Sequence, residues 1–169
     1  MRKISFILAI IICFSLSSVA QNSHTINKMS LGLDFGFPAG DANNGVLLLG
    51  LNLQYEYPVS QSTSLTGSAG YSFQFSTGKG GSSNGNLPLK IGGKQYLNQN
   101  LYVTAETGVI FNLISYGQTT SFAFSPGLGL SLPTPTKSSI DLGLRYEKWV
   151  NPDSPLSFFA LRAAYAFGL

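Results

Sequence analysis

The chain has 169 residues, a formal net charge of +3, one histidine and one cysteine, and 44% of its residues are hydrophobic. Arg2 and Lys3 lie in the leader-like start, and the remaining eight basic residues nearly balance the seven acidic ones. A near-neutral chain of this length predicts a single domain and no nucleic-acid partner. Cys13 lies in the same leader, so the mature chain would have no thiol for disulfide, metal or redox chemistry.

The first twenty residues have the pattern of a secretory signal peptide. Arg2 and Lys3 precede an apolar run from Ile4 to Leu16, and the small residues Ser18-Val19-Ala20 follow it. This run is shorter than the roughly 20 residues that a transmembrane helix needs. We therefore expect export, with cleavage after Ala20.

From Ser30 to the C-terminus, apolar residues take every second position in eight successive stretches. A period of two predicts β-strands. The predicted strands are, in chain order, Ser30–Phe37, Val46–Tyr57, Ser64–Phe75, Asn86–Tyr96, Leu101–Phe111, Ser121–Leu132, Ile140–Glu147 and Phe159–Leu169. We expect residues 1–20 to be the signal peptide, 21–29 a periplasmic tail and 30–169 the barrel domain.

All charged residues inside these stretches lie on the face opposite the leucine and phenylalanine side chains. They are Asp34, Glu56, Lys90, Lys94, Glu106, Asp141, Arg145, Glu147 and Arg162. Strands can satisfy their backbone in lipid only by closing, and an Arg or Lys that faces the bilayer midplane costs about 2–4 kcal/mol. The pattern predicts an all-β, eight-stranded antiparallel up-and-down transmembrane β-barrel. Its apolar face points outward, and a structural ion-pair network fills its lumen.

Two prolines interrupt the alternation. Pro88 removes a donor from the ladder of hydrogen bonds, so we place it near a strand end or rim. Pro126 makes the sixth predicted strand the least regular of the eight.

The predicted connections alternate between short and long. The short ones, typical of periplasmic turns, are Val59–Thr63, Leu97–Asn100 and Pro133–Ser138. The longer ones, typical of extracellular loops, are Pro38–Gly45, Ser76–Gly85, Asn112–Thr120 and Lys148–Ser157.

Aromatic residues gather near both ends of the strands, as in the two interfacial girdles of membrane barrels. The inner girdle is predicted to hold Tyr55, Tyr57, Tyr165 and Phe167, and the outer one Phe35, Phe37, Phe73, Phe75, Tyr146 and Trp149. Trp149 could alternatively anchor a partner at the outer surface.

The strands offer no evident catalytic, cofactor or metal site. The only histidine, His24, precedes the first strand, so a Ser-His pair on the barrel is not available. The segment around Asp41 lacks the carboxylates of a calcium loop and predicts a turn. Lumenal glutamates beside Lys90 or Lys94 could act as acid and base, but a charge-balanced plug is the favoured interpretation. We expect neither enzyme activity nor a cofactor.

Two pairs of segments resemble a known family. Residues 87–97 with 101–108 resemble the central hairpin of small PorT-like outer-membrane β-barrel proteins, and 142–147 with 161–167 resemble the last hairpin. These barrels are similar in architecture to the OmpA and OmpX transmembrane domains. The resemblance implies the outer membrane of a Gram-negative bacterium and insertion by the barrel assembly machinery. It often comes with no assigned activity.

The function expected from these patterns is structural or surface-interactive. A monomer surrounded by outer-membrane lipid would meet an unidentified ligand or partner through its extracellular loops. Three alternatives remain open: a narrow, porin-like passive channel, a lipid-modifying outer-membrane enzyme, and a secreted soluble barrel that holds an apolar ligand.

Overall fold

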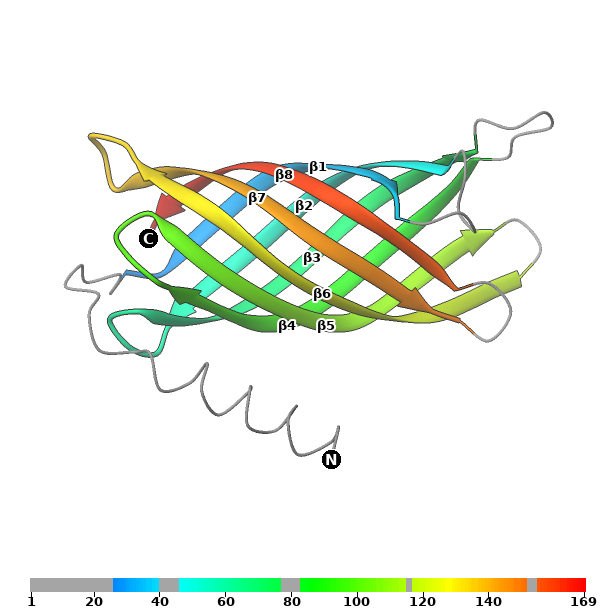
Figure 1. Cartoon of the computed structure of the whole chain (residues 1–169), viewed down its shortest axis with the longest axis horizontal. Helices are drawn as coiled ribbons and strands as arrows, with labels where there is room; N and C mark the ends of the chain where they lie inside the picture. Colours follow the sequence, from blue (N-terminus) through cyan, green and yellow to red (C-terminus); the bar gives the residue numbers. More distant parts are fainter. Residues whose placement is uncertain (1–25, 40–45, 77–82, 115–116, 152–154) are drawn as a thin grey trace.

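Eight antiparallel strands form one closed barrel in the computed structural model, which describes residues 26–39, 46–76, 83–114, 117–151 and 155–169 (Figure 1). The strands are β1 (Lys28–Pro38), β2 (Val46–Pro58), β3 (Thr63–Ser76), β4 (Ser83–Tyr96), β5 (Leu101–Ile114), β6 (Gly117–Pro133), β7 (Ser138–Val150) and β8 (Leu156–Gly168). Each strand pairs with its neighbours in sequence, and β1 pairs with β8 along its whole length. Closure leaves no unpaired sheet edge, and the predicted fold class is confirmed.

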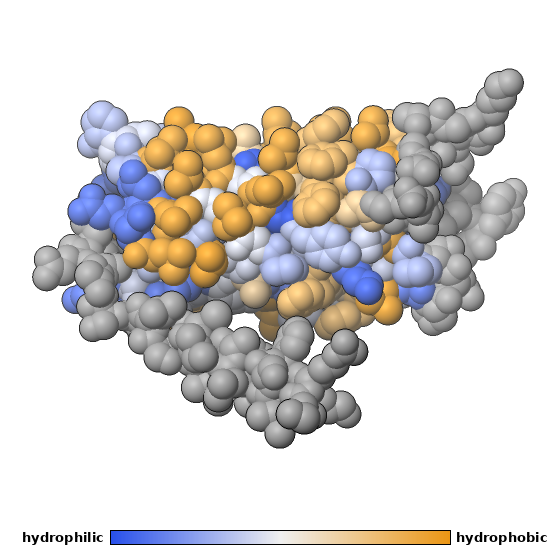
Figure 2. Space-filling view, in the orientation of Figure 1, coloured by the Kyte–Doolittle hydropathy of each residue, from blue (hydrophilic) through white to orange (hydrophobic). Residues whose placement is uncertain are grey.

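Side-chain exposure alternates along the strands in the predicted phase. In β1, Leu33 is 59% exposed whereas the adjacent Asp34 is 6% exposed. In β8, Leu161 points outward and Arg162 inward. Figure 2 shows apolar side chains gathered over the outer wall of the barrel. The predicted orientation, with the greasy face outward, is therefore confirmed.

The two ends of the barrel differ. The short connections 59–62, 97–100 and 134–137 lie together with the C-terminus at one end, on the left in Figure 1, which we call the turn end. These turns are closed by backbone hydrogen bonds such as Leu97 N–H to the Leu101 carbonyl (2.8 Å). The opposite end, where β1, β3, β5 and β7 connect to the strands that follow them, is the loop end.

At the loop end the strands run further than predicted. β4 begins at Ser83, β5 continues to Ile114, β6 begins at Gly117, and β7 reaches Val150. Much of the loops expected at residues 112–120 and 148–157 is therefore strand. Cross-strand pairing persists to Ile114 and Gly117 because the ladder needs only backbone groups, which side-chain alternation does not report.

The placement of Pro88 at a rim is wrong, because this residue lies within β4. Its pairing with β5 continues through Ile110, while pairing with β3 is interrupted between Leu89 and Asn86. Pro126 lies within β6 in the same way, paired to β5 but in a gap of the β6–β7 ladder. At each proline, pairing is therefore kept with one neighbouring strand and interrupted with the other, because proline has no backbone N–H to donate.

Several sequence-based expectations lie outside the described residues. These are the signal peptide 1–20 with its cleavage after Ala20, His24, the turn around Asp41, and residues 77–82 of a predicted loop. In the described ranges, no helix has the length and apolar character needed to cross a membrane.

Candidate functional site in the lumen

The structure places all nine residues of the predicted charge network on the inner wall, where they are 1–8% exposed. Lys28, which was not predicted, is a tenth buried charge at 8% exposure. The buried charges of the described residues are thus five cations and five anions. Lys28 was missed because the first strand was predicted to begin at Ser30, although Lys28 has the inward parity of Ser30 and Asp34.

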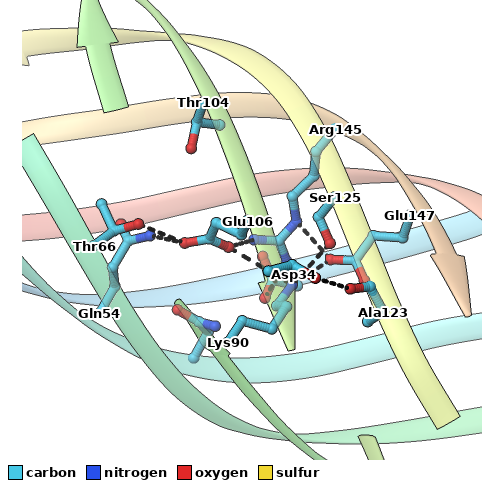
Figure 3. A network of polar contacts seen from close by, with 12 residues as sticks. Asp34, Gln54, Thr66, Lys90, Thr104, Glu106, Ala123, Ser125, Arg145 and Glu147 are labelled. Carbon is cyan, nitrogen blue, oxygen red and sulfur yellow. Dashed lines mark hydrogen bonds and ion pairs between the residues drawn. The ribbon is translucent and has the colours of Figure 1, made fainter. Parts of the chain in front are cut away.

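The first cluster is centred on Glu147 of β7, and Figure 3 shows it from close by. Its Oε1 lies 2.5 Å from Lys90 Nζ and 3.1 Å from Arg145 Nε. Arg145 also pairs with Asp34 on β1, one strand beyond β8, with 2.9 Å between Nη2 and Oδ2. Three strands, β1, β4 and β7, are thereby tied together by charge-assisted hydrogen bonds and ion pairs.

Glu106 extends this cluster toward β2 and β3. Its Oε1 accepts hydrogen bonds from Gln54 Nε2 at 2.7 Å and Thr66 Oγ1 at 3.2 Å, as Figure 3 shows. Lys90 and Arg145 lie further away, at 3.8 and 3.9 Å. Neutral donors therefore satisfy one carboxylate oxygen, while the other faces the two cations.

A second cluster lies nearer the turn end and is centred on Lys94. Its Nζ lies 2.9 Å from Glu56 Oε2 and 2.8 Å from Asp141 Oδ2. Ser131 donates to Asp141 at 2.6 Å, and the Tyr96 hydroxyl donates to Glu56 at 2.9 Å. A buried cation between two hydrogen-bonded carboxylates has the partners that a charge in a low-dielectric interior requires.

Aromatic rings complete this turn-end cluster. The Lys94 ammonium lies 4.2 Å from the ring centroid of Tyr102, and Lys28 lies 5.7 Å from that of Tyr96. The two tyrosine rings contact each other edge to face at 5.9 Å. Cation–π contacts and ion pairs together fill this part of the lumen.

Arg162 is held by neutral groups. It donates to Gln54 Oε1 at 2.7 Å, to Ser30 Oγ at 3.0 Å and to Asn52 Oδ1 at 3.2 Å. Gln54 therefore links Arg162 to Glu106. A cavity of about 20 Å³ lies beside these residues and Tyr102, which is room for about one water molecule.

The loop-end side of the lumen is closed by an apolar layer, which the sequence analysis did not predict. The layer consists of Leu48, Ile110, Ala123, Trp149, Phe158 and Ala160. Trp149 is 4% exposed, packs edge to face on Phe158 at 5.2 Å, and donates from Nε1 to Glu147 Oε2 at 2.9 Å.

Both sequence-based roles for Trp149, in the outer girdle or as a surface anchor, are therefore wrong. β7 continues its alternation to Val150, so Trp149 points inward with Arg145 and Glu147. Trp149 follows Arg145 and Glu147 at every second position, and this spacing alone could have predicted that its side chain faces the lumen.

The sequence matches no protein-family model and no curated protein. The fold is similar to that of the outer membrane protein Ail of Yersinia pestis, with 19% identity, a TM-score of 0.58, and coverage of 85% of this chain and 100% of Ail. Neisserial surface protein A is similar over 83% of this chain and 92% of its own, with 9% identity and a TM-score of 0.53. A de novo designed transmembrane β-barrel is similar over 89% of this chain and 100% of its own, with 14% identity and a TM-score of 0.51. The chain thus has the eight-stranded barrel fold of outer-membrane proteins.

Proposed function

We propose that this protein is an integral outer-membrane β-barrel with a closed, structural lumen, and that it interacts with its surroundings through its loop end. The observation that carries the proposal is the inverted distribution of polarity. Ten buried charges of the described strands fill the inside, whereas the outside presents large apolar side chains along all eight strands. Water would favour the opposite arrangement, and hydrocarbon favours this one.

The outward-facing charges support a membrane position. In the described strands, Lys148 near the end of β7 is the one charged residue with an outward-facing side chain, and Lys137 lies in the turn before β7. The eleven residue-to-residue steps from Lys137 to Lys148 span about 36 Å along an extended strand. A strand tilted by roughly 40° converts this length to about 28 Å, close to the apolar band of about 25 Å in membrane barrels.

The aromatic residues support the same position. Tyr55, Tyr57, Tyr165 and Phe167 are exposed near the turn end, and Phe35, Phe73 and Phe75 are exposed toward the loop end. Two such girdles mark the headgroup levels of membrane barrels. Trp149, which is buried in the lumen, is not part of the outer girdle.

The lumen favours a structural role over conduction. The Lys90–Glu147 ion pair joins β4 to β7 across the lumen, and the apolar layer of Leu48, Trp149, Phe158 and their neighbours lies between it and the loop end. A cavity of about 20 Å³ admits no hydrated ion. The soluble-barrel alternative is disfavoured as well, because a carrier of apolar ligands needs a greasy interior.

Cleavage of the signal peptide after Ala20, insertion by the barrel assembly machinery and the PorT-like relationship remain parts of this proposal. They rest on the leader pattern and on the resemblance of the hairpin segments, not on the fold. The fold alone does not assign a task, since a designed barrel shares it.

Membrane fractionation combined with gel mobility tests the proposal. The protein should sediment with outer-membrane markers, and its unheated form should migrate differently from the boiled form because the closed barrel resists detergent. Recovery in the soluble periplasm without a mobility shift would contradict the proposal.

A further inference from the structure

Among the described residues, five amide side chains line the inner wall at the loop end. These loop-end amides are Gln74 in β3, Asn84 and Asn86 in β4, Asn112 in β5, and Asn151 just after β7. They share the inward parity of the buried charges deeper in the barrel. Gln74, Asn84, Asn112 and Asn151 are half-buried, so solvent reaches them.

Strand pairing joins these amides into a continuous arc. Ser72 lies opposite Asn86, and Asn86 lies opposite Asn112. Asn112 donates to Ser121 Oγ at 3.1 Å, and Asn151 donates to the same hydroxyl at 3.5 Å. Five neighbouring strands therefore present neutral donors and acceptors side by side.

Two polar atoms at the deep side of the arc have no hydrogen-bond partner among the described residues. They are Nδ2 of Asn86, which is 1% exposed, and Oγ of Ser72, which is 4% exposed. Buried polar groups normally find partners, because an unpaired one is costly. A ligand that brings a hydrogen-bond acceptor would satisfy the hydrogen-bonding capacity of both groups.

The surroundings of the arc disfavour a charged ligand. Ile110, Ala123 and Trp149 lie one inward position deeper on β5, β6 and β7, and they belong to the apolar layer. Lys148 on β7 faces outward, so the nearest inward-facing charge on this strand is Glu147, whose Oε2 already accepts the Trp149 hydrogen bond. A ligand at the arc therefore meets amides, hydroxyls and apolar surface, because the described residues of the arc carry no charged side chain.

We propose that the loop-end amides bind a neutral sugar that carries hydroxyl and amide groups. Each amide side chain offers both donors and an acceptor, which matches hydroxyls that also do both. The apolar layer beneath lowers the local dielectric constant, which strengthens these hydrogen bonds. This inference rests on the proposed function, because it places the loop end at the cell surface.

The direct test is titration of the folded protein, in a detergent without a sugar headgroup, with chitotriose. The chain has one tryptophan, Trp149, directly below the arc, so its fluorescence reports binding. We expect a saturable change with a dissociation constant on the order of millimolar, as for a ligand with few contacts. A linear response up to about 50 mM chitotriose, or saturation by heparin disaccharide but not by chitotriose, would overturn the inference.

Two substitutions locate the site. Asn86→Leu and Asn112→Leu remove donors at similar volume and should each weaken binding about tenfold or more. Gln99→Leu makes a comparable change in the exposed 97–100 turn at the opposite end and should leave binding unchanged. If the leucine variants fail to show the folded gel mobility, Asn86→Ser and Asn112→Ser replace them. Equal affinity in the folded variants and the wild type would also overturn the inference.

Labelling of intact cells separates this inference from the proposed function. A cysteine introduced at exposed Thr120, near the loop end of β6, should react with an impermeant reagent. Labelling without chitotriose binding rejects only the sugar site. If the cysteine is protected on intact cells but reacts in opened cells, the proposed orientation fails.

Discussion

Glu147 joins the ionic and apolar parts of the lumen. Its Oε1 pairs with Lys90 and Arg145, and its Oε2 accepts a hydrogen bond from Trp149. Glu147→Gln would leave the two cations without this carboxylate. Breaking a buried ion pair from one side typically costs about 3–5 kcal/mol. We expect a loss of that order in the free energy of unfolding, measured by urea titration of the folded protein in micelles.

Lys148→Gln is the matched control for this prediction. It removes an exposed charge from the next position of the same strand, and it should change the unfolding free energy by less than about 0.5 kcal/mol. Similar effects of the two substitutions would contradict the assigned role of Glu147.

The burial of Trp149 gives a second prediction at the residue scale. Because it is 4% exposed, its emission should be blue-shifted and poorly quenched by acrylamide in the folded barrel. In Glu147→Gln the indole loses its charged acceptor, and quenching should increase. Folded protein that is quenched as strongly as the urea-unfolded chain would place the indole outside the lumen.

At the scale of the single strand, depth decides the cost of a charge on the outer face of β2. Leu51 lies near the middle of this strand and is 51% exposed, so Leu51→Arg should cost about 2–4 kcal/mol and sharply reduce assembly. Tyr57, 52% exposed on the same face, lies next to the turn end, where an arginine costs about 0–1 kcal/mol. The heat-modifiable fraction should therefore fall in Leu51→Arg and persist in Tyr57→Arg, and equal fractions would argue against the membrane band.

Glycines in β5 and β3, the two neighbours of β4, provide a second test of the wall. A Cβ added at Gly108 would overlap the backbone carbonyl of Leu89 in β4, whereas one added at Gly67 would meet no heavy atom within 4 Å. Gly108→Ala should thus destabilise the barrel by about 1–3 kcal/mol in urea unfolding. Gly67→Ala should have little effect, and a Gly108→Ala barrel of wild-type stability would contradict the close β4–β5 approach.

At the scale of the whole molecule, the lumen is closed by two layers of different chemistry. Wild-type protein should show no unitary currents in planar bilayers. Combined Trp149→Ala and Phe158→Ala substitutions open only the apolar layer, so the ion pairs of Lys90, Arg145 and Asp34 should keep this variant silent as well. Steady currents through the wild type would favour the channel alternative.

Much of this architecture was predictable from the chain alone. Period-two alternation set the number and order of the strands and the inward side of all nine predicted charges. It missed Lys28, the strand ends at Ser83 and Val150, and the interior position of Pro88, because ladder pairing depends on the neighbouring strand. It also misplaced Trp149, whose residue type suggested a girdle while its parity indicated the lumen.

The sequence by itself determined which face of each strand carries charge, because parity is a local property and a charge in hydrocarbon is expensive. Only the tertiary structure decided which charges meet. Lys94 reaches Glu56 and Asp141, 38 and 47 residues away in the chain, because closure and strand register bring β2, β4 and β7 around one narrow lumen. The same closure gathers apolar residues from β2, β5, β6, β7 and β8 into a single layer, since side chains of opposite walls meet across a small barrel.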